Sequence, residues 1–540
     1  MSTIDRFRLV GLALLAFADP LAPARAGAQP APAAERHAQE GFRLAQEGRD
    51  FRSAEAELRE AVRLEPSNSA YLSALGGVLA VQGRFAEAGE LFEKALVLRP
   101  SDLAIRRNLA AAQWQQGRLR LASANLERIL RVQPGDEPSI LLQGIVRAEL
   151  HDCERALPLI ESVAVLARAR PEAGIALATC YYASGKLPQG REALMRLLSP
   201  PAPAGNRLRG ARIAARADDF ETALRLFSSI RSEGEDRPAL QYNIAYCQYR
   251  LGHFRDARET LGLLAEGRQG GSAVLSLIGW SHHAEGRLEQ AIPAFRSAIE
   301  ASPREDSNYL DLAMALMDSK RHPAALSVVE AALKTVPDSF ALVLMRGILE
   351  TALGHYIDAI ESFGRARKLN PDSPEANLNL ALVQSAAGEK NASRETLDAG
   401  MERFPGHAPH YLEHGRLLLA LCRTGDDCSR DRAGSMFRKA MELDRESSEA
   451  RYEAGMLALE DGLYPEAAGL LESASRLDPG KSKFALALAR AYVRLGRSEE
   501  AAAERTRFET LRGEEDLANP RYYGQRRAEP RGLFDRAASP

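Results

Sequence analysis

Three histidines and a glutamate near residue 410 are the side chains best suited to chemistry. His410 and His414 are four residues apart, which places both on one face of a helix, and His407 and Glu413 lie nearby. Imidazole and carboxylate groups at this spacing can hold a metal ion. His414 also falls at a position that normally packs against a neighbouring helix, which favours structural histidines. We therefore predict no metal site and no cofactor.

The cysteines give a second candidate for chemistry. Cys153, Cys180, Cys247, Cys422 and Cys428 form no C-x-x-C pair, so a zinc ribbon, a redox motif or an attached haem is unsupported. Cys422 and Cys428 flank an acidic insertion and could close a small disulfide loop in an oxidising compartment. The alternative is two free thiols. The odd number leaves at least one thiol without an intramolecular partner.

The usual sequence signatures of catalysis are missing. Gly480-Lys481-Ser482 has no glycine five residues before Gly480 and follows a predicted helix rather than a strand, which excludes a phosphate-binding loop. Neither G-x-S-x-G nor H-E-x-x-H occurs. The formal net charge is −2, so no strong bulk field attracts nucleic acid. We predict no catalytic residues and no nucleic-acid partner.

The amino-terminal residues have the order of a secretory leader. Arg6 and Arg8 precede a ten-residue apolar run, Leu9–Ala18, and Ala24-Arg25-Ala26 gives an A-x-A cleavage site. This order predicts a signal peptide over residues 1–26 and a linker over 27–34. A frayed amino-terminal helix is the alternative. No later segment is long and apolar enough to insert into a membrane. We expect an exported protein, periplasmic or secreted, and the excess of arginine over lysine fits a bacterial source.

The rest of the chain repeats with a period of 34 residues. Pro66, Pro100 and Pro134 are spaced by this period, and so are Pro303, Pro337, Pro371 and Pro405. When these prolines are set at place 32 of a 34-residue frame, small residues fall into columns. Alanine recurs at places 20 and 27, and glycine at places 8 and 15. Fixed columns of this kind indicate a repeat architecture rather than a set of separate domains.

Each repeat is predicted to be a pair of helices. Apolar residues recur at steps of three and four, as in Leu91, Phe92 and Ala95. Glycine at place 15 tolerates the left-handed conformation that ends the first helix, and proline at place 32 cannot continue the second. Small residues at places 8, 20 and 27 let the helix axes approach closely. A pair this apolar must bury its face against the next pair.

This pattern resembles the tetratricopeptide repeat, and the resemblance covers nearly the whole chain. The best copies are residues 69–102 and 272–305. The resemblance implies an all-α fold, a right-handed superhelical α-solenoid of about fourteen helix-turn-helix units. The repeats are expected to start at residues 35, 69, 103, 137, 171, 204, 238, 272, 306, 340, 374, 408, 448 and 482.

The frame is weakest between residues 137 and 237. Pro158 falls inside a second helix, and Pro200-Pro201-Ala202-Pro203 interrupts the phase. A rigid kink there would divide the solenoid into an N-terminal stack, 35–203, and a C-terminal stack with a capping helix, 204–512. The alternative is a loop with no effect on stacking. The last residues, 513–540, lose periodicity and are predicted to be a disordered tail.

A binding surface follows from the resemblance. In tetratricopeptide proteins the first helix of each repeat lines the concave face, and a partner peptide or helix commonly binds there. An aromatic stripe leading into methionines suits such a surface. The alternative is that these side chains pack against the neighbouring helix and expose little. The implied residues are Tyr242, Asn243, Tyr246, Tyr249, Trp280, His283, Leu310, Met314, Met317, Leu344 and Ile348.

The sequence thus favours a non-catalytic scaffold that binds a peptide or helix of a protein partner along the concave groove. The resemblance suggests a place in a bacterial envelope complex that serves assembly, secretion or polysaccharide export. The alternative is the binding arm of an enzyme system, or an enzyme with a site between repeats. Such an enzyme would need ionisable residues clustered in a pocket. The sequence leaves the partner and the oligomeric state open.

Overall fold

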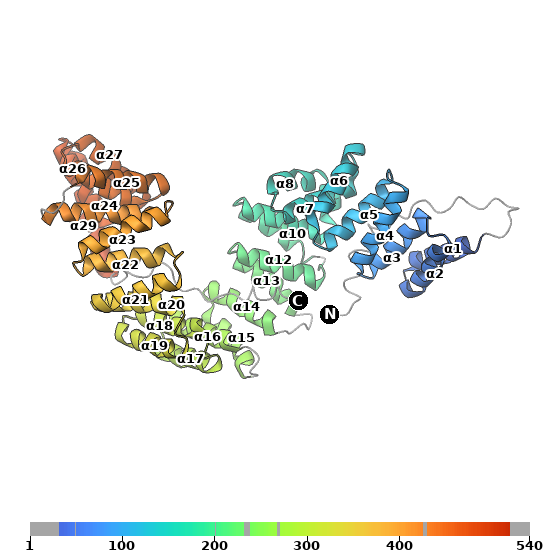
Figure 1. The fold of residues 1–540 in the computed structure, drawn as a ribbon, viewed down its shortest axis with the longest axis horizontal. Coiled ribbons are helices and arrows are strands. Elements are labelled where there is room, and N and C mark those ends of the chain that lie inside the picture. The colour runs from blue at the N-terminus through green and yellow to red at the C-terminus, as the bar shows by residue number, and fades with distance from the viewer. Residues whose placement is uncertain are drawn as a thin grey trace. The chain divides into compact units, whose positions relative to one another are not determined.

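The structure is a computed structural model that describes residues 32–48, 50–199, 201–231, 238–266, 271–424 and 429–518. The predicted signal peptide lies outside these ranges. Within them the chain forms 29 α-helices, most of which are labelled in Figure 1, and divides between Thr260 and Leu261 into two compact units, here the N-terminal and C-terminal units. The predicted all-α fold is confirmed.

The helices of the N-terminal unit follow one another in pairs, and in one pair the second helix is split in two. They are α1 (Ala33–Glu47), α2 (Phe51–Leu64), α3 (Ser69–Val81), α4 (Phe85–Leu98), α5 (Leu103–Gln115), α6 (Leu119–Val132), α7 (Glu137–Glu149), α8 (Cys153–Ser162), α9 (Ala164–Arg168), α10 (Pro171–Ala183), α11 (Leu187–Met195), α12 (Ala204–Arg216), α13 (Phe220–Arg231) and α14 (Pro238–Arg250). The next helix, α15 (Phe254–Glu266), contains the division between the units.

The C-terminal unit continues the same alternation. Its helices are α16 (Gly271–Ala284), α17 (Leu288–Ala301), α18 (Asp306–Asp318), α19 (His322–Thr335), α20 (Phe340–Ala352), α21 (Tyr356–Leu369), α22 (Pro374–Ala386), α23 (Lys390–Arg403), α24 (Ala408–Thr424), α25 (Arg430–Leu443), α26 (Ser448–Glu460), α27 (Tyr464–Leu477), α28 (Ser482–Arg494) and α29 (Ser498–Ala518). Of the fourteen first helices, only α1 and α16 begin away from the predicted residue, two and one residues earlier.

Side-chain caps explain why the first helices start where they do. Asn68, Asp102, Asp136, Ser339 and Ser373 each stand just before a first helix and accept a hydrogen bond from a backbone N–H of its first turn. Short polar side chains at this position satisfy amide groups that the helix itself leaves without acceptors. The turn that follows the place-32 proline of a repeat therefore ends one helix and supplies the cap that starts the next.

The glycine column at place 15 marks the turn between the two helices of a repeat. All nine predicted glycines have positive φ: Gly83, Gly117, Gly185, Gly252, Gly286, Gly354, Gly388, Gly462 and Gly496. Of the five repeats that lack glycine there, three have His151, Asp218 or Lys320 in the same conformation, with φ near +60°. The fold therefore requires a positive φ at this turn, and glycine is the residue that adopts this conformation with the least strain.

The other small-residue columns hold the helices together. The place-20 alanines of the described repeats are fully or almost fully buried. At place 8, an added Cβ on Gly76, Gly279 or Gly347 would lie within 3 Å of a phenylalanine ring from the second helix of the same repeat. The ring occupies the volume that glycine leaves empty. Close packing of this kind explains how a core with few aromatic residues is filled.

A pair of glycines in one repeat tests this packing. We expect Gly347→Ala to destabilise the α20–α21 repeat by about 1–2 kcal/mol, because its Cβ would lie 2.7 Å from Cε1 of Phe363. Gly364→Ala, on α21 with no atom within 4 Å, should instead stabilise the repeat by up to about 1 kcal/mol through helix propensity. Hydrogen exchange of α20 and α21 in the full chain measures the change in stability that each substitution causes. Equal changes in the two variants would contradict the close packing at Gly347.

Two predicted boundaries differ from the structure. Near residue 203 the helices stay packed, because α10 and α11 both contact α12, and the division into compact units falls at Thr260 instead. At the carboxyl end, α29 continues through Gly513 to Ala518, six residues into the predicted disordered tail. Its added residues are mostly strong helix formers, which outweigh one glycine. Residues 519–540 lie outside the described ranges.

Candidate partner-binding face

The contacts among helices show which side of the C-terminal unit could receive a partner. Each first helix packs against its own second helix and, from α18 onward, also against the second helix before it. Neighbouring first helices also contact one another, as in α16–α18, α18–α20, α20–α22 and α22–α24, whereas contacts between neighbouring second helices in the described part of this unit are sparse. Because the first helices are closer together, they form the inner side. We call places 2, 5, 6, 9 and 12 of these helices the first-helix face.

The predicted tyrosines of the N-terminal unit are mostly core residues. Tyr242 and Tyr246 on α14 are 2% and 6% exposed, and Asn243 is also buried. The Tyr246 ring lies edge-on to Phe220 of α13 at 6.0 Å, and the Arg250 guanidinium lies 4.3 Å from the Phe220 centroid and donates to the Tyr246 hydroxyl at 3.1 Å. The sequence predicts Tyr242, Asn243 and Tyr246 as surface residues, and the structure corrects this prediction. Of the predicted residues on α14, only Tyr249 is half-buried.

Trp280 on α16 is also a core residue rather than a surface anchor. Its side chain is 3% exposed and lies edge-on to Phe295 of α17, with ring centroids 5.4 Å apart. Phe295 is the ring that fills the space beside Gly279, so Trp280 extends the same close packing. The neighbouring His283 is half-buried, and burial lowers its pKa. The spacing predicts an exposed aromatic stripe, but packing against Phe295 of the second helix buries Trp280.

The aliphatic part of the predicted surface is accessible. Leu310, Met314 and Met317 on α18, and Leu344 and Ile348 on α20, are all half-buried. The row continues beyond the predicted residues with Leu378 on α22 and with Tyr452 and Met456 on α26, also half-buried. Leu382 on α22 is 40% exposed. Partly exposed apolar side chains along successive first helices, here called the accessible apolar row, are what remains of the predicted surface.

An ionic network at the carboxyl end of this row was not foreseen from the sequence. Arg416 of α24 contacts Glu413 of its own helix at 2.7 Å, and Glu449 and Glu453 of α26 at 2.7 and 2.9 Å. Lys483 of α28 reaches Glu449 at 2.7 Å. Burial raises the pKa of Glu413 despite the adjacent guanidinium. The signal in the sequence was the run of acidic residues at places 2 and 6.

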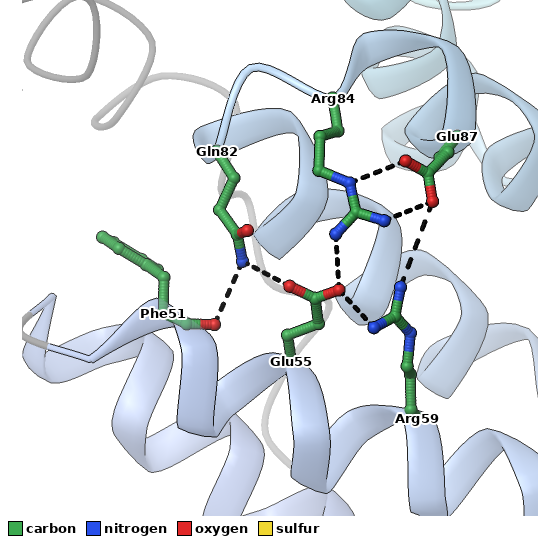
Figure 2. Close-up of polar contacts among 6 residues, drawn as sticks. All are labelled: Phe51, Glu55, Arg59, Gln82, Arg84 and Glu87. Carbon is green, nitrogen blue, oxygen red and sulfur yellow. Dashed lines mark hydrogen bonds and ion pairs between the residues drawn. The ribbon is translucent and has the colours of Figure 1, made fainter. Parts of the chain in front are cut away.

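A second polar network, in the N-terminal unit, bears on the enzyme alternative. Figure 2 shows the buried Glu55 of α2 among Gln82, Arg84 and Arg59. Gln82 donates to Glu55 at 2.8 Å, and Arg84 and Arg59 contact its other oxygen at 2.6 and 2.5 Å. Because both carboxylate oxygens are occupied, Glu55 holds α2 to the turn between α3 and α4. It is a structural clamp and offers no general base to a substrate.

The histidines near residue 410 are structural. His410 and His414 of α24 are fully buried. The Nδ1 atoms of His407 and His410 lie 2.6 Å apart, and His410 Nε2 lies 3.0 Å from Asn377 Oδ1 of α22. Burial lowers the pKa of His410 to about 4. His414 points elsewhere, with Nε2 3.7 Å from Asp398 Oδ1. Within the described ranges, no group of three or more His, Cys, Asp or Glu side chains is arranged to hold a metal ion.

The cysteines form a disulfide that the sequence reasoning did not identify. Cys153, the first residue of α8, is bonded to Cys180 of α10, with the Cα atoms 5.1 Å apart. Cys247 is a free, buried thiol, whose pKa burial raises to about 12. Cys422 is disulfide-bonded, but Cys428 lies outside the described residues, so the Cys422–Cys428 pairing stays a prediction. No helix in the described part combines the length and apolarity needed to cross a bilayer.

Comparison with known families identifies the repeat. One tetratricopeptide repeat pattern matches residues 40–102. A second pattern of the same description matches residues 79–143, 214–280, 282–345, 350–414 and 458–504, more than half of the chain. These matches include α18, α22 and all of α20 except residues 346–349, and these three helices carry most of the apolar row.

Individual relatives are similar over short stretches only. A TPR repeat-containing protein of Pseudomonas aeruginosa is 37% identical over 95 residues, which cover 17% of this chain and 16% of that protein. A CTR9 homolog of Arabidopsis thaliana is 25% identical over 122 residues, 22% of this chain and 11% of that protein. Among solved structures, yeast Tom70 is 17% identical with a TM-score of 0.39, covering 90% of this chain and 92% of Tom70. A MamA structure is 24% identical with a TM-score of 0.28, covering 32% of this chain and 97% of MamA.

Proposed function

Because the chain belongs to the tetratricopeptide repeat family and is a protein–protein interaction scaffold, we propose that its partner binds the first-helix face of the C-terminal unit. The observation that carries this proposal is the accessible apolar row along α18, α20 and α22. Soluble proteins seldom leave a contiguous apolar row accessible unless it binds something. The partner segment is a peptide or a helix laid across the first helices, in the manner of other helix-in-groove complexes.

The composition of the row fits an adaptable contact. Met314, Met317 and Met456 have flexible, polarizable side chains that adjust to partners of different shape. Leu382 provides the most exposed apolar side chain of the row. The buried Tyr242, Tyr246 and Trp280 pack inside their own repeats and do not contribute to this surface. The binding surface is therefore aliphatic, not aromatic.

We also propose that the protein is exported and works in a bacterial envelope complex. Two observations support export: the leader-like order of residues 1–26, and the Cys153–Cys180 disulfide, since such bonds persist in oxidising compartments. Cell fractionation of the full chain, compared with a chain lacking residues 1–26, tests this. Recovery of both in the cytoplasmic fraction would contradict export.

The binding proposal is tested by exchanging one exposed leucine for a charge. Proteins co-isolated with the tagged full chain from cell extracts are expected to be depleted at least about tenfold by Leu382→Asp, because a buried carboxylate is unpaired in the complex. Ile357→Asp is the matched control: Ile357 on α21 is 71% exposed and lies on a second helix, away from the first-helix face. Equal co-isolation with both variants would contradict this site.

A further inference from the structure

We propose that the segment bound by the first-helix face is a basic amphipathic one, with aliphatic side chains on one side and lysine or arginine on the other. This inference rests on the function proposed above and specifies the chemistry of the partner. It follows from the charged side chains along α18, α20, α22, α24 and α26. On the first-helix face these side chains are nearly all acidic, and they lie on one side of the apolar row.

The charged side chains of this face are nearly all acidic. Five carboxylates occupy places 2 and 6 of α18, α22, α24 and α26: Asp311, Glu375, Glu413, Glu449 and Glu453. Arg416 is the one basic residue at places 2, 5, 6, 9 or 12 of these described helices. The two nearby arginines outside those places are engaged elsewhere: Arg346 pairs with the buried Glu350, and Arg451 donates to the Ser447 carbonyl.

The carboxylates form a row beside the apolar one. On a helix, places 2 and 6 are one turn apart on the same side, and places 5, 9 and 12 form the adjacent stripe. Leu310, Met314 and Met317 therefore run alongside Asp311, and Tyr452 and Met456 alongside Glu449 and Glu453. A segment crossing several first helices meets aliphatic side chains along one edge and carboxylates along the other.

The basic residues of the network do not balance the carboxylates. Arg416 is shared by three of them, and Lys483 of α28 reaches one that Arg416 already contacts. Burial of the Glu413 carboxyl raises its pKa in spite of Arg416, so additional positive charge nearby would stabilise its ionised form. The three carboxylates of this network therefore face two basic side chains, and an incoming lysine or arginine adds positive charge that they can accept.

The acidic row is local to these helices. In the N-terminal unit, α12 carries Arg209 and Arg212 at the corresponding places 6 and 9, and Arg216 at place 13 beside them. At the other end, α28 carries Lys483 and Arg490 at places 2 and 9. A partner with acidic flanks would place like charges beside the row, and a purely apolar partner would desolvate the carboxylates without pairing them. Both are disfavoured relative to a basic amphipathic segment.

The test measures binding of designed helices to the full chain by fluorescence anisotropy. Three labelled 14-residue probes share the same amphipathic leucine pattern and differ in their polar residues, which are lysine, glutamate or glutamine. We expect the leucine–lysine probe to bind at least about tenfold more tightly than the other two, and this advantage to fall with rising salt. The variant Asp311→Asn/Glu375→Gln/Glu453→Gln should weaken the leucine–lysine probe about tenfold.

A matched variant on the second helices, Asp358→Asn/Glu361→Gln/Glu395→Gln, removes the same charge away from the face and should leave the affinity unchanged. Equal weakening by both variants, or tighter binding of the leucine–glutamate probe, would overturn the charge inference. If the leucine–glutamate probe binds more tightly but Leu382→Asp still weakens its binding, the charge inference fails while the proposed face is supported. If Leu382→Asp changes the binding of none of the three probes, the result contradicts the proposed face instead.

The chain's own residues 519–540 are the competing occupant, because they carry five arginines together with Tyr522, Tyr523, Leu533 and Phe534. A chain ending at Ala518 separates the two cases. We expect its affinity for the leucine–lysine probe to match that of the full chain. An increase of tenfold or more would show that this segment fills the face, and would overturn the inference of an external basic partner.

Discussion

Reduction of the Cys153–Cys180 disulfide is expected to lower the free energy of unfolding of the N-terminal unit by about 3–4 kcal/mol. The bond closes a loop with a sequence separation of 27 residues, and loss of the cross-link restores the conformational entropy of that loop in the unfolded chain. Urea unfolding with and without reductant, followed by hydrogen exchange of α7 to α10, measures the change.

The surrounding helices explain why this part of the unit needs a cross-link. Pro158 lies inside α8 and removes a backbone donor, and the second helix of this repeat is split into α8 and the five-residue α9. The disulfide joins the start of α8 to α10 of the next repeat, where both contact α7. It thereby supports the weakest repeat of the frame.

Two variants make the disulfide prediction specific. Cys153→Ser/Cys180→Ala should reproduce the reduced stability and abolish the effect of reductant. Cys247→Ala, which removes a buried but free thiol, should leave the effect of reductant intact. An N-terminal unit equally stable in the reduced and oxidised chains would show that the cross-link does not contribute.

Acidification from pH 7 to pH 5 is expected to destabilise the α24–α25 repeat by about 2 kcal/mol. Burial, and then the charge of His407, lower the pKa of His410 from 6.5 to about 4. The unfolded chain therefore takes up this proton first as the pH falls. The stability present above pH 6.5 is lost progressively between pH 6.5 and pH 4. Hydrogen exchange of α24 at the two pH values measures the loss.

The geometry around His410 gives this loss its structural cause. Its Nδ1 lies 2.6 Å from Nδ1 of His407, so one ring must donate and the other accept, and the pair cannot hold a proton on both nitrogens. Nε2 lies against Asn377, and the ring stacks on Phe404 at 5.8 Å. The Glu375 carboxylate acts in the opposite direction and favours the charged ring. Protonation thus disrupts the packing of α24 on α22.

Substitution at two histidines separates this effect from general acid sensitivity. His410→Leu should flatten the change in α24 exchange between pH 7 and pH 5, even if the variant is less stable at both. His355→Asn, at an exposed turn before α21, should keep the wild-type pH dependence. A wild-type slope in His410→Leu would assign the acid sensitivity to other groups.

The fold was predictable because it depends on backbone turns and small residues. Glycine at place 15 and proline at place 32 report a left-handed turn and a helix end, which are local properties, and the repeats multiply the signal. The candidate site was only partly predictable. Tyr242, Tyr246 and Trp280 fall at the correct places, yet Phe220 and Phe295 cover two of these rings, and a frame of places does not reveal such contacts.

The polar features depend on contacts between repeats. The network around Arg416 joins three helices, and Cys153 and Cys180 meet because α8 packs on α10. Neither follows from a motif, since the residues are distant in sequence and of common type. The acidic residues at places 2 and 6 were visible in the sequence, but their meaning required the row of Leu310, Met314 and Leu382 beside them.

Site-specific photo-crosslinking in cells tests the central claim most directly. A photoreactive amino acid at position 382, on the first-helix face of α22, is compared with the same residue at position 357, on the second helix α21 of the preceding repeat. We predict a discrete crosslinked partner from position 382 that is lost when Glu375, Glu413 and Glu453 are neutralised, and no such product from position 357. Crosslinks to the same protein from position 357, with none from position 382, would contradict a partner-binding role for the first-helix face.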